Sequence, residues 1–187
     1  MLLLVRHGET ASNARGHLLG RADPPLSPTG QRQADAMAMW LPPADVVVSS
    51  PLMRARQTAA VFGRPVTVDE RWIERDYGPY DDGPPDALSD EEWARWRCDE
   101  AFTPDGIEPE SSIRRRVNAA CEELSAQAAS SVVIVVSHVS PIKSALAWAL
   151  GITGTLAWRL FVEDAGVSRV DITDDGPVVR WFNRGGL

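Results

Sequence analysis

The sequence predicts an α/β fold built on a parallel sheet, and two observations carry the prediction. Short apolar runs within 2–6, 45–50 and 132–136 have the length and polar flanks of strands that are buried on both faces. Segments with helical signals separate these runs along the chain. Strands that alternate with helices are typical of a parallel sheet, because parallel neighbours need crossover connections.

Start and stop signals place the elements in order. Ser27 can cap the first free amides of a helix, Pro28 suits its first position, and Pro42 ends it. We expect helices over 28–40, 51–62, 89–98, 110–128 and 141–150. We expect further strands over 65–68, 167–172 and 178–182, the last two joined as a hairpin across 174–177.

Residues 69–109 interrupt the alternation of strands and helices. This segment is aromatic, acidic and rich in turn residues, and it contains one short helix. We interpret it as an insertion that covers the sheet edge, so that 1–187 forms a single domain. Trp93 and Trp96 share one face of the short helix and either line a substrate pocket or pack the cover.

Composition narrows the class of partner and the compartment. The 187 residues are 44% hydrophobic and carry a net charge of −7, so nucleic acid and anionic membranes are not expected partners. No apolar run is long enough to cross a bilayer. Cys98 and Cys121 lie in unrelated contexts without metal-ligand spacing, which favours a reduced, cytoplasmic protein without a metal.

Polar side chains with catalytic potential follow the predicted strands. Arg6 and His7 end the first strand, and His138 ends the strand over 132–136. Arg54 lies one helical turn beyond the strand over 45–50, and Glu74 lies in the covering segment. Because the carboxyl ends of parallel strands meet at one side of a sheet, we expect these five residues to share a crevice.

This set of side chains suits phosphoryl transfer. Guanidinium groups bind phosphate oxygens in pairs, and a neutral imidazole can attack phosphorus to form a covalent intermediate. A second imidazole can donate to an oxygen that gains charge in the transition state. A carboxyl group can protonate the leaving oxygen and then activate water. The two steps require neither a metal nor a cofactor.

Several motifs along nearly the whole chain support this chemistry. They are Arg6-His7-Gly8-Glu9-Thr10, the loop and helix start over 20–31, the segment Ser49 to Ala59, Glu74 to Gly78, and Ser137-His138. In this order they resemble the histidine phosphatase superfamily, in its phosphoglycerate-mutase-like branch, which includes histidine acid phosphatases and cofactor-dependent phosphoglycerate mutases.

The resemblance implies a fold and a role for each matching residue. The fold would be a three-layer α/β/α sandwich with a mostly parallel central sheet. His7 would be the phosphorylated nucleophile, and Glu74 would be the proton donor. The remaining phosphate ligands would be Arg6, Asn13, Arg54 and His138.

Three segments depart from the pattern of the family. Residues 108–111 read Glu-Pro-Glu-Ser where Gly-Gly-Glu-Ser is common, which changes the rim of the pocket. Ser140 follows the second histidine where glycines are common, and we expect it to cap a helix. Asp164 stands where asparagine is usual, and we expect it to matter only structurally. On the helix over 110–128, we expect Arg114–Arg116 to form a solvated face.

The resulting hypothesis is a metal-independent phosphatase of a small phosphorylated metabolite that works through a phosphohistidine. A phosphoglycerate-type mutase and a non-catalytic phospho-ligand-binding module are the alternatives. A mutase must exclude water from its site, and this chain has few residues that could form such a cover. A module that only binds a phosphorylated ligand has no need of a proton donor such as Glu74. Hydrolysis is therefore favoured. The C-terminal strands leave a sheet edge that can pair in a homodimer.

Overall fold

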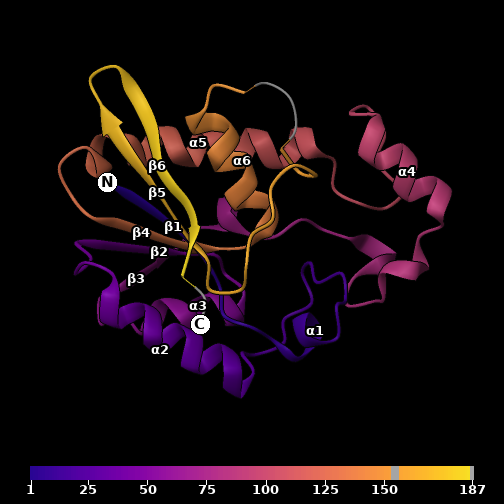
Figure 1. Ribbon diagram of the computed structural model, residues 1–187, viewed down its shortest axis with the longest axis horizontal. Coiled ribbons are helices and arrows are strands. Elements are labelled where there is room, and N and C mark those ends of the chain that lie inside the picture. Colours follow the sequence, from indigo (N-terminus) through magenta and orange to yellow (C-terminus); the bar gives the residue numbers. More distant parts are fainter. Residues whose placement is uncertain (153–155, 186–187) are drawn as a thin grey trace.

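A computed structural model describes residues 1–152 and 156–185 and shows one central sheet between two helical layers (Figure 1). Within these ranges the sheet has six strands in the order β3-β2-β4-β1-β5-β6. The strands are β1 (Leu2–Arg6), β2 (Val46–Ser49), β3 (Val66–Val68), β4 (Val133–Ser137), β5 (Val167–Thr173) and β6 (Gly176–Arg184).

The first four strands in this order are parallel, as the sequence predicts. β4 lies between β2 and β1, and Arg6 of β1 pairs with Ser137 of β4. β5 runs antiparallel to β1, and β6 closes the predicted hairpin on β5. Gly176 adopts a φ of 110° at the start of β6, which a residue with a side chain rarely adopts. The sheet is therefore parallel except at its C-terminal edge.

The six α-helices of the described ranges include all five predicted from the sequence. They are α1 (Ala11–Ala14), α2 (Pro28–Trp40), α3 (Met53–Ala60), α4 (Asp90–Cys98), α5 (Glu110–Ala128) and α6 (Val139–Ala149). Ser27 caps α2 by accepting a hydrogen bond from the backbone N–H of Gly30, and Ser89 caps α4 in a reciprocal pair with Glu92.

Alternate residues of the strands pack on opposite layers. Leu2 and Leu4 belong to the cluster under α5 and α6, whereas Leu3 and Val5 belong to the cluster under α2 and α3. Figure 1 shows these helix pairs on opposite sides of the sheet. Burying each such side chain stabilises the fold by roughly 1.5–3 kcal/mol. The three-layer architecture implied by the resemblance is therefore confirmed.

The segment 69–109 forms short 3-10 turns at Glu70–Trp72, Gly78–Tyr80 and Pro85–Ala87, followed by α4. Figure 1 shows α4 at the side of the molecule, away from the sheet. Trp93 and Trp96 stack with ring centroids 5.5 Å apart, and Trp158 meets Trp96 edge to face. Trp96 packs in this cluster, which confirms one of the two roles expected for it. It also lines a recess, and its contact with a substrate stays a prediction. No helix in the described ranges is long and apolar enough to span a membrane.

Candidate active site

The two histidines lie side by side at the ends of neighbouring strands. Because Arg6 and Ser137 are partners in the β1–β4 register, His7 and His138 leave the sheet together. Their ring centroids are 5.0 Å apart. His7 is 3% exposed and His138 is fully buried, so almost no part of either ring reaches the surface. The structure thus brings the two histidines together at the carboxyl ends of neighbouring strands, as the sequence predicts.

Hydrogen bonds fix the tautomer of His7. Its Nδ1 lies 2.7 Å from the carbonyl oxygen of Gly8, which can only accept, so Nδ1 carries the proton. Nε2 is therefore unprotonated, and its electron pair accepts a hydrogen bond from Nε of Arg54 at 3.2 Å. Burial, together with the charges of Arg54 and Arg6, holds the pKa of His7 well below its ordinary value. His7 is thus neutral at pH 7, with Nε2 as its unprotonated nitrogen.

The loop after His7 contacts the helical layer formed by α2 and α3. Gly8 lies so close to α2 that a Cβ at this position would be 2.4 Å from the carbonyl oxygen of Gly30. The backbone N–H of Gly8 also donates to the hydroxyl of Thr58 on α3, at 3.1 Å. Gly8 is therefore required for close backbone approach, and this contact holds His7 in place.

Arg54 is fully buried on α3, and a loop of the chain orients its guanidinium group. Its two terminal nitrogens donate to the carbonyl oxygens of Ala22 (2.7 Å) and Gly20 (2.6 Å). Burial lowers the pKa of Arg54 to about 10, opposed chiefly by the charge of Glu74, so the group stays positive at pH 7. The carboxylate of Asp81 accepts the backbone N–H groups of residues 20–22 and so shapes this loop.

Arg6 is held by the loop before β5. Its guanidinium forms an ion pair with Asp164 at 2.6 Å and donates to the carbonyl oxygen of Val162 at 2.6 Å. Burial raises the pKa of Asp164, and the charge of Arg6 opposes this effect. Asp164 thus directly contacts a candidate catalytic arginine, and the expectation that it matters only structurally stays a prediction. Nε of Arg6 is buried without a hydrogen-bond partner among the described residues.

Ser50 orients the ring of His138. Its hydroxyl lies 2.7 Å from Nε2 of His138, and Nδ1 is buried without a partner among the described residues. Burial, with the charges of Arg54 and His7, holds the pKa of His138 well below its ordinary value. A neutral ring that accepts from Ser50 at Nε2 carries its proton on Nδ1, where it can be donated to an anion.

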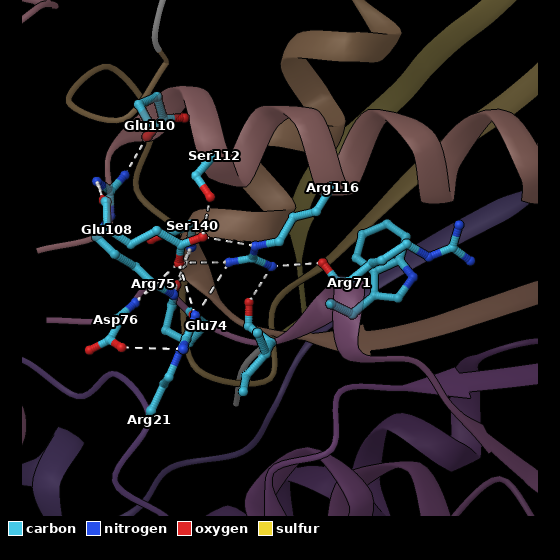
Figure 2. Close-up of polar contacts among 12 residues, drawn as sticks. Arg21, Arg71, Glu74, Arg75, Asp76, Glu108, Glu110, Ser112, Arg116 and Ser140 are labelled. Carbon is cyan, nitrogen blue, oxygen red and sulfur yellow. Dashed lines mark hydrogen bonds and ion pairs between the residues drawn. The ribbon is translucent and has the colours of Figure 1, made fainter. Parts of the chain in front are cut away.

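Glu74 reaches this centre from the covering segment. Its Oε1 accepts from the backbone N–H groups of Arg75 (2.6 Å) and Ser140 (3.2 Å), and it is 3% exposed. Figure 2 shows Glu74 beside Ser140 at the start of α6. The expectation that Ser140 caps a helix is wrong. His138 is the N-cap residue of α6, and Ser140 binds Glu74 through its backbone.

Arg116 does not lie on a solvated face, so the expectation for Arg114–Arg116 is wrong at this position. It donates to the backbone carbonyls of Arg71 (2.7 Å) and Ile73 (2.6 Å), as Figure 2 shows. It also pairs with Glu108 at 3.1 Å. Burial opposes ionisation of Glu108, but the bonds from Arg116 and Ser112 lower its pKa overall. Arg116 therefore ties α5 to the segment that carries Glu74. Helical periodicity gives no signal for this contact.

One further predicted residue, Asn13, lies on α1. Its Oδ1 accepts from the backbone N–H and the hydroxyl of Thr10, which caps α1, and its phosphate contact stays a prediction. Arg21 forms salt bridges with Asp76 and Glu108. Within residues 1–152 and 156–185, no group of three or more His, Cys, Asp or Glu side chains could hold a metal ion.

Comparison with known families agrees with this geometry. The family described as "Histidine phosphatase superfamily (branch 1)" matches residues 2–185. The chain belongs to this superfamily. The matched range includes His7, Glu74 and His138.

Individual relatives extend the comparison. The chain is 34% identical over 99% of its length to a bifunctional protein of Mycobacterium tuberculosis, of which it covers 54%. The chain thus spans about half the length of the first curated relatives that it matches. A probable phosphoglycerate mutase of Yersinia pestis is 33% identical, with coverage of 90% of this chain and 83% of the relative. A crystal structure of a phosphoserine phosphatase mutant from Entamoeba histolytica, in complex with phosphoserine, has a TM-score of 0.88 and 25% identity, with coverage of 98% and 96%.

Proposed function

We propose that this chain is a metal-independent phosphomonoesterase that acts on a small phosphorylated metabolite through a phosphohistidine at His7. The observation that carries the proposal is the fixed tautomer of His7. The carbonyl of Gly8 holds the proton on Nδ1, so Nε2 is unprotonated and its electron pair accepts a hydrogen bond from Nε of Arg54. A histidine that served only to bind an anion would need to offer N–H donors, not a lone pair.

In the first step, Nε2 of His7 attacks phosphorus and the bond to the leaving oxygen breaks. Arg6, Arg54 and Nδ1–H of His138 stabilise the charge on the phosphoryl oxygens. Glu74 enters in its acid form and gives its proton to the leaving oxygen, so that a neutral alcohol departs. The product of this step is phosphohistidine and a Glu74 carboxylate.

The second step restores the enzyme. The Glu74 carboxylate takes a proton from a water molecule, whose oxygen attacks the phosphorus. The bond between phosphorus and Nε2 breaks, inorganic phosphate leaves, and His7 returns to the neutral tautomer that Gly8 stabilises. Over the two steps Glu74 loses and regains one proton and His7 returns to its neutral form, so the proton transfers require only side chains of this chain.

A phosphoglycerate-type mutase is the second candidate, because the Yersinia relative carries that name. A mutase would return the phosphoryl group to an organic acceptor rather than to water. The likeness to a phosphoserine phosphatase, of which this chain covers 96%, supports hydrolysis.

Hydrolysis of a generic aryl phosphate and a panel of phosphorylated metabolites in EDTA tests the proposal. We expect wild type to release inorganic phosphate and His7→Ala to release none. Isomerised product without inorganic phosphate would favour the mutase. No turnover of any compound, with tight binding of phosphate retained, would favour the non-catalytic binding module.

A further inference from the structure

A recess opens beside Glu74, between α6 and the covering segment. Its inner part has a volume of about 60 Å³, and an outer part of about 270 Å³ shares Arg75, Trp96 and Trp158 with it. The inner part is also lined by Tyr77, Ser140 and Lys143. Ser140 binds Glu74 through its backbone N–H, so the recess begins next to the candidate acid. A leaving group protonated by Glu74 would extend into this space.

Lys143 is the only lysine in the 187 residues, against eighteen arginines. It lies on α6 one turn beyond Ser140, and its partly buried ammonium donates to the carbonyl oxygen of Ala157 at 2.5 Å. An ammonium group has three N–H donors, and this carbonyl is its one acceptor among the described residues. Burial lowers the pKa of Lys143, and the charge of Glu74 opposes this effect.

The guanidinium group of Arg75, which lines both parts of the recess, already has partners. Arg75 forms an ion pair with Glu110, and it donates to the carbonyl oxygen of Glu108 at 2.9 Å. The carboxylate of Glu74 accepts backbone N–H groups. Among the described residues, no carboxylate lies within ion-pair distance of Lys143, in contrast to Arg75.

We propose that this recess is the leaving-group subsite of the phosphomonoesterase, and that Lys143 there binds a carboxylate of the substrate. This inference rests on the function proposed above. A carboxylate would supply the acceptors that Lys143 lacks. The hydroxyl of Tyr77, which is hydrogen-bonded to Ser140, lies at the same wall. Trp96 and Trp158 would cover the carbon skeleton. The substrate class is a small phosphomonoester with a carboxylate on its alcohol part.

Matched substrates test the subsite. 3-Phosphoglycerate and glycerol 3-phosphate differ only in a carboxylate against a hydroxymethyl group. We expect wild type to favour 3-phosphoglycerate in kcat/KM by roughly 10–100-fold, the usual range for a charge-assisted hydrogen bond. Lys143→Met should bring this ratio close to one, Lys143→Arg should keep most of it, and Arg56→Met, which removes an exposed charge elsewhere, should keep all of it.

Binding measured without turnover separates the two proposals. In His7→Ala labelled with ¹⁵N-lysine, Lys143 gives the only lysine side-chain signal. We expect 3-phosphoglycerate to shift this signal and glycerol 3-phosphate to leave it nearly unchanged. A shift without hydrolysis by wild type would support the subsite and overturn the phosphatase. Hydrolysis with equal preference for both substrates, or an unmoved signal, would overturn the subsite alone.

Discussion

At the scale of single residues, the environment of each candidate catalytic group selects its protonation state. His7 and His138 are buried beside Arg6 and Arg54, so both rings are neutral at pH 7. The carbonyl of Gly8 fixes the proton of His7 on Nδ1, and the hydroxyl of Ser50 contacts Nε2 of His138. His7 thus presents an unprotonated Nε2, the atom that the proposed mechanism uses as the nucleophile.

The role of Glu74 as an acid is tested by the leaving group. In Glu74→Gln the backbone contacts to Arg75 and Ser140 can persist, but the proton is lost. We expect kcat for an alkyl phosphate to fall roughly 10²–10⁴-fold, because an alkoxide leaves poorly. Hydrolysis of p-nitrophenyl phosphate should fall far less, since nitrophenolate leaves without a proton. Equal losses on both substrates would contradict the assignment.

At the scale of elements, α5 positions the catalytic centre although none of its residues reaches the histidines. Arg116 holds the carbonyls of Arg71 and Ile73, just before Glu74. This contact joins a helix of one layer to the covering segment. We infer that α5 sets the position of the acid relative to the sheet.

Replacing Arg116 tests this link. Arg116→Met removes the side chain that donates to the carbonyls of Arg71 and Ile73 and pairs with Glu108, and we expect a loss of roughly 2–4 kcal/mol in the free energy of unfolding. The exposed neighbour provides the control, since Arg115→Met should change stability by less than about 0.5 kcal/mol. Urea unfolding measures both. Equal effects in the two variants would show that Arg116 has no special structural role.

At the scale of the whole molecule, apolar patterning predicts much of the fold, and long-range polar contacts are what it misses. Buried runs ending at His7 and His138 predict the parallel strands, and therefore the meeting of the two histidines. The inward turn of Arg116 and the ion pair of Asp164 with Arg6 depend on residues far away in the chain. Neither helical period nor motif spacing records such contacts, so they emerge only from the structure.

Burial of two neutral histidines also makes global stability depend on pH. The pKa values of His7 and His138 are lowered in the folded state, so the unfolded chain binds more protons below about pH 6.5. The contribution of the two neutral rings to the free energy of unfolding is therefore fully present above pH 6.5 and is lost as the pH falls below it. Each ring lowers the free energy of unfolding by up to about 1.4 kcal/mol per pH unit. Urea unfolding between pH 7.5 and 5.5 should show a smaller slope in His138→Gln. An unchanged slope would contradict buried, neutral His138.

The most direct test of the account is to trap the phosphoryl group on His7. Brief exposure to a ³²P-labelled phosphomonoester in EDTA, followed by denaturation, should leave a label that is stable in alkali and lost in acid, as phosphohistidine is. Peptide mapping should place the label at His7, and His7→Ala should carry none and turn over no substrate. Turnover that persists in His7→Ala, or hydrolysis without any labelled histidine, would contradict the central claim.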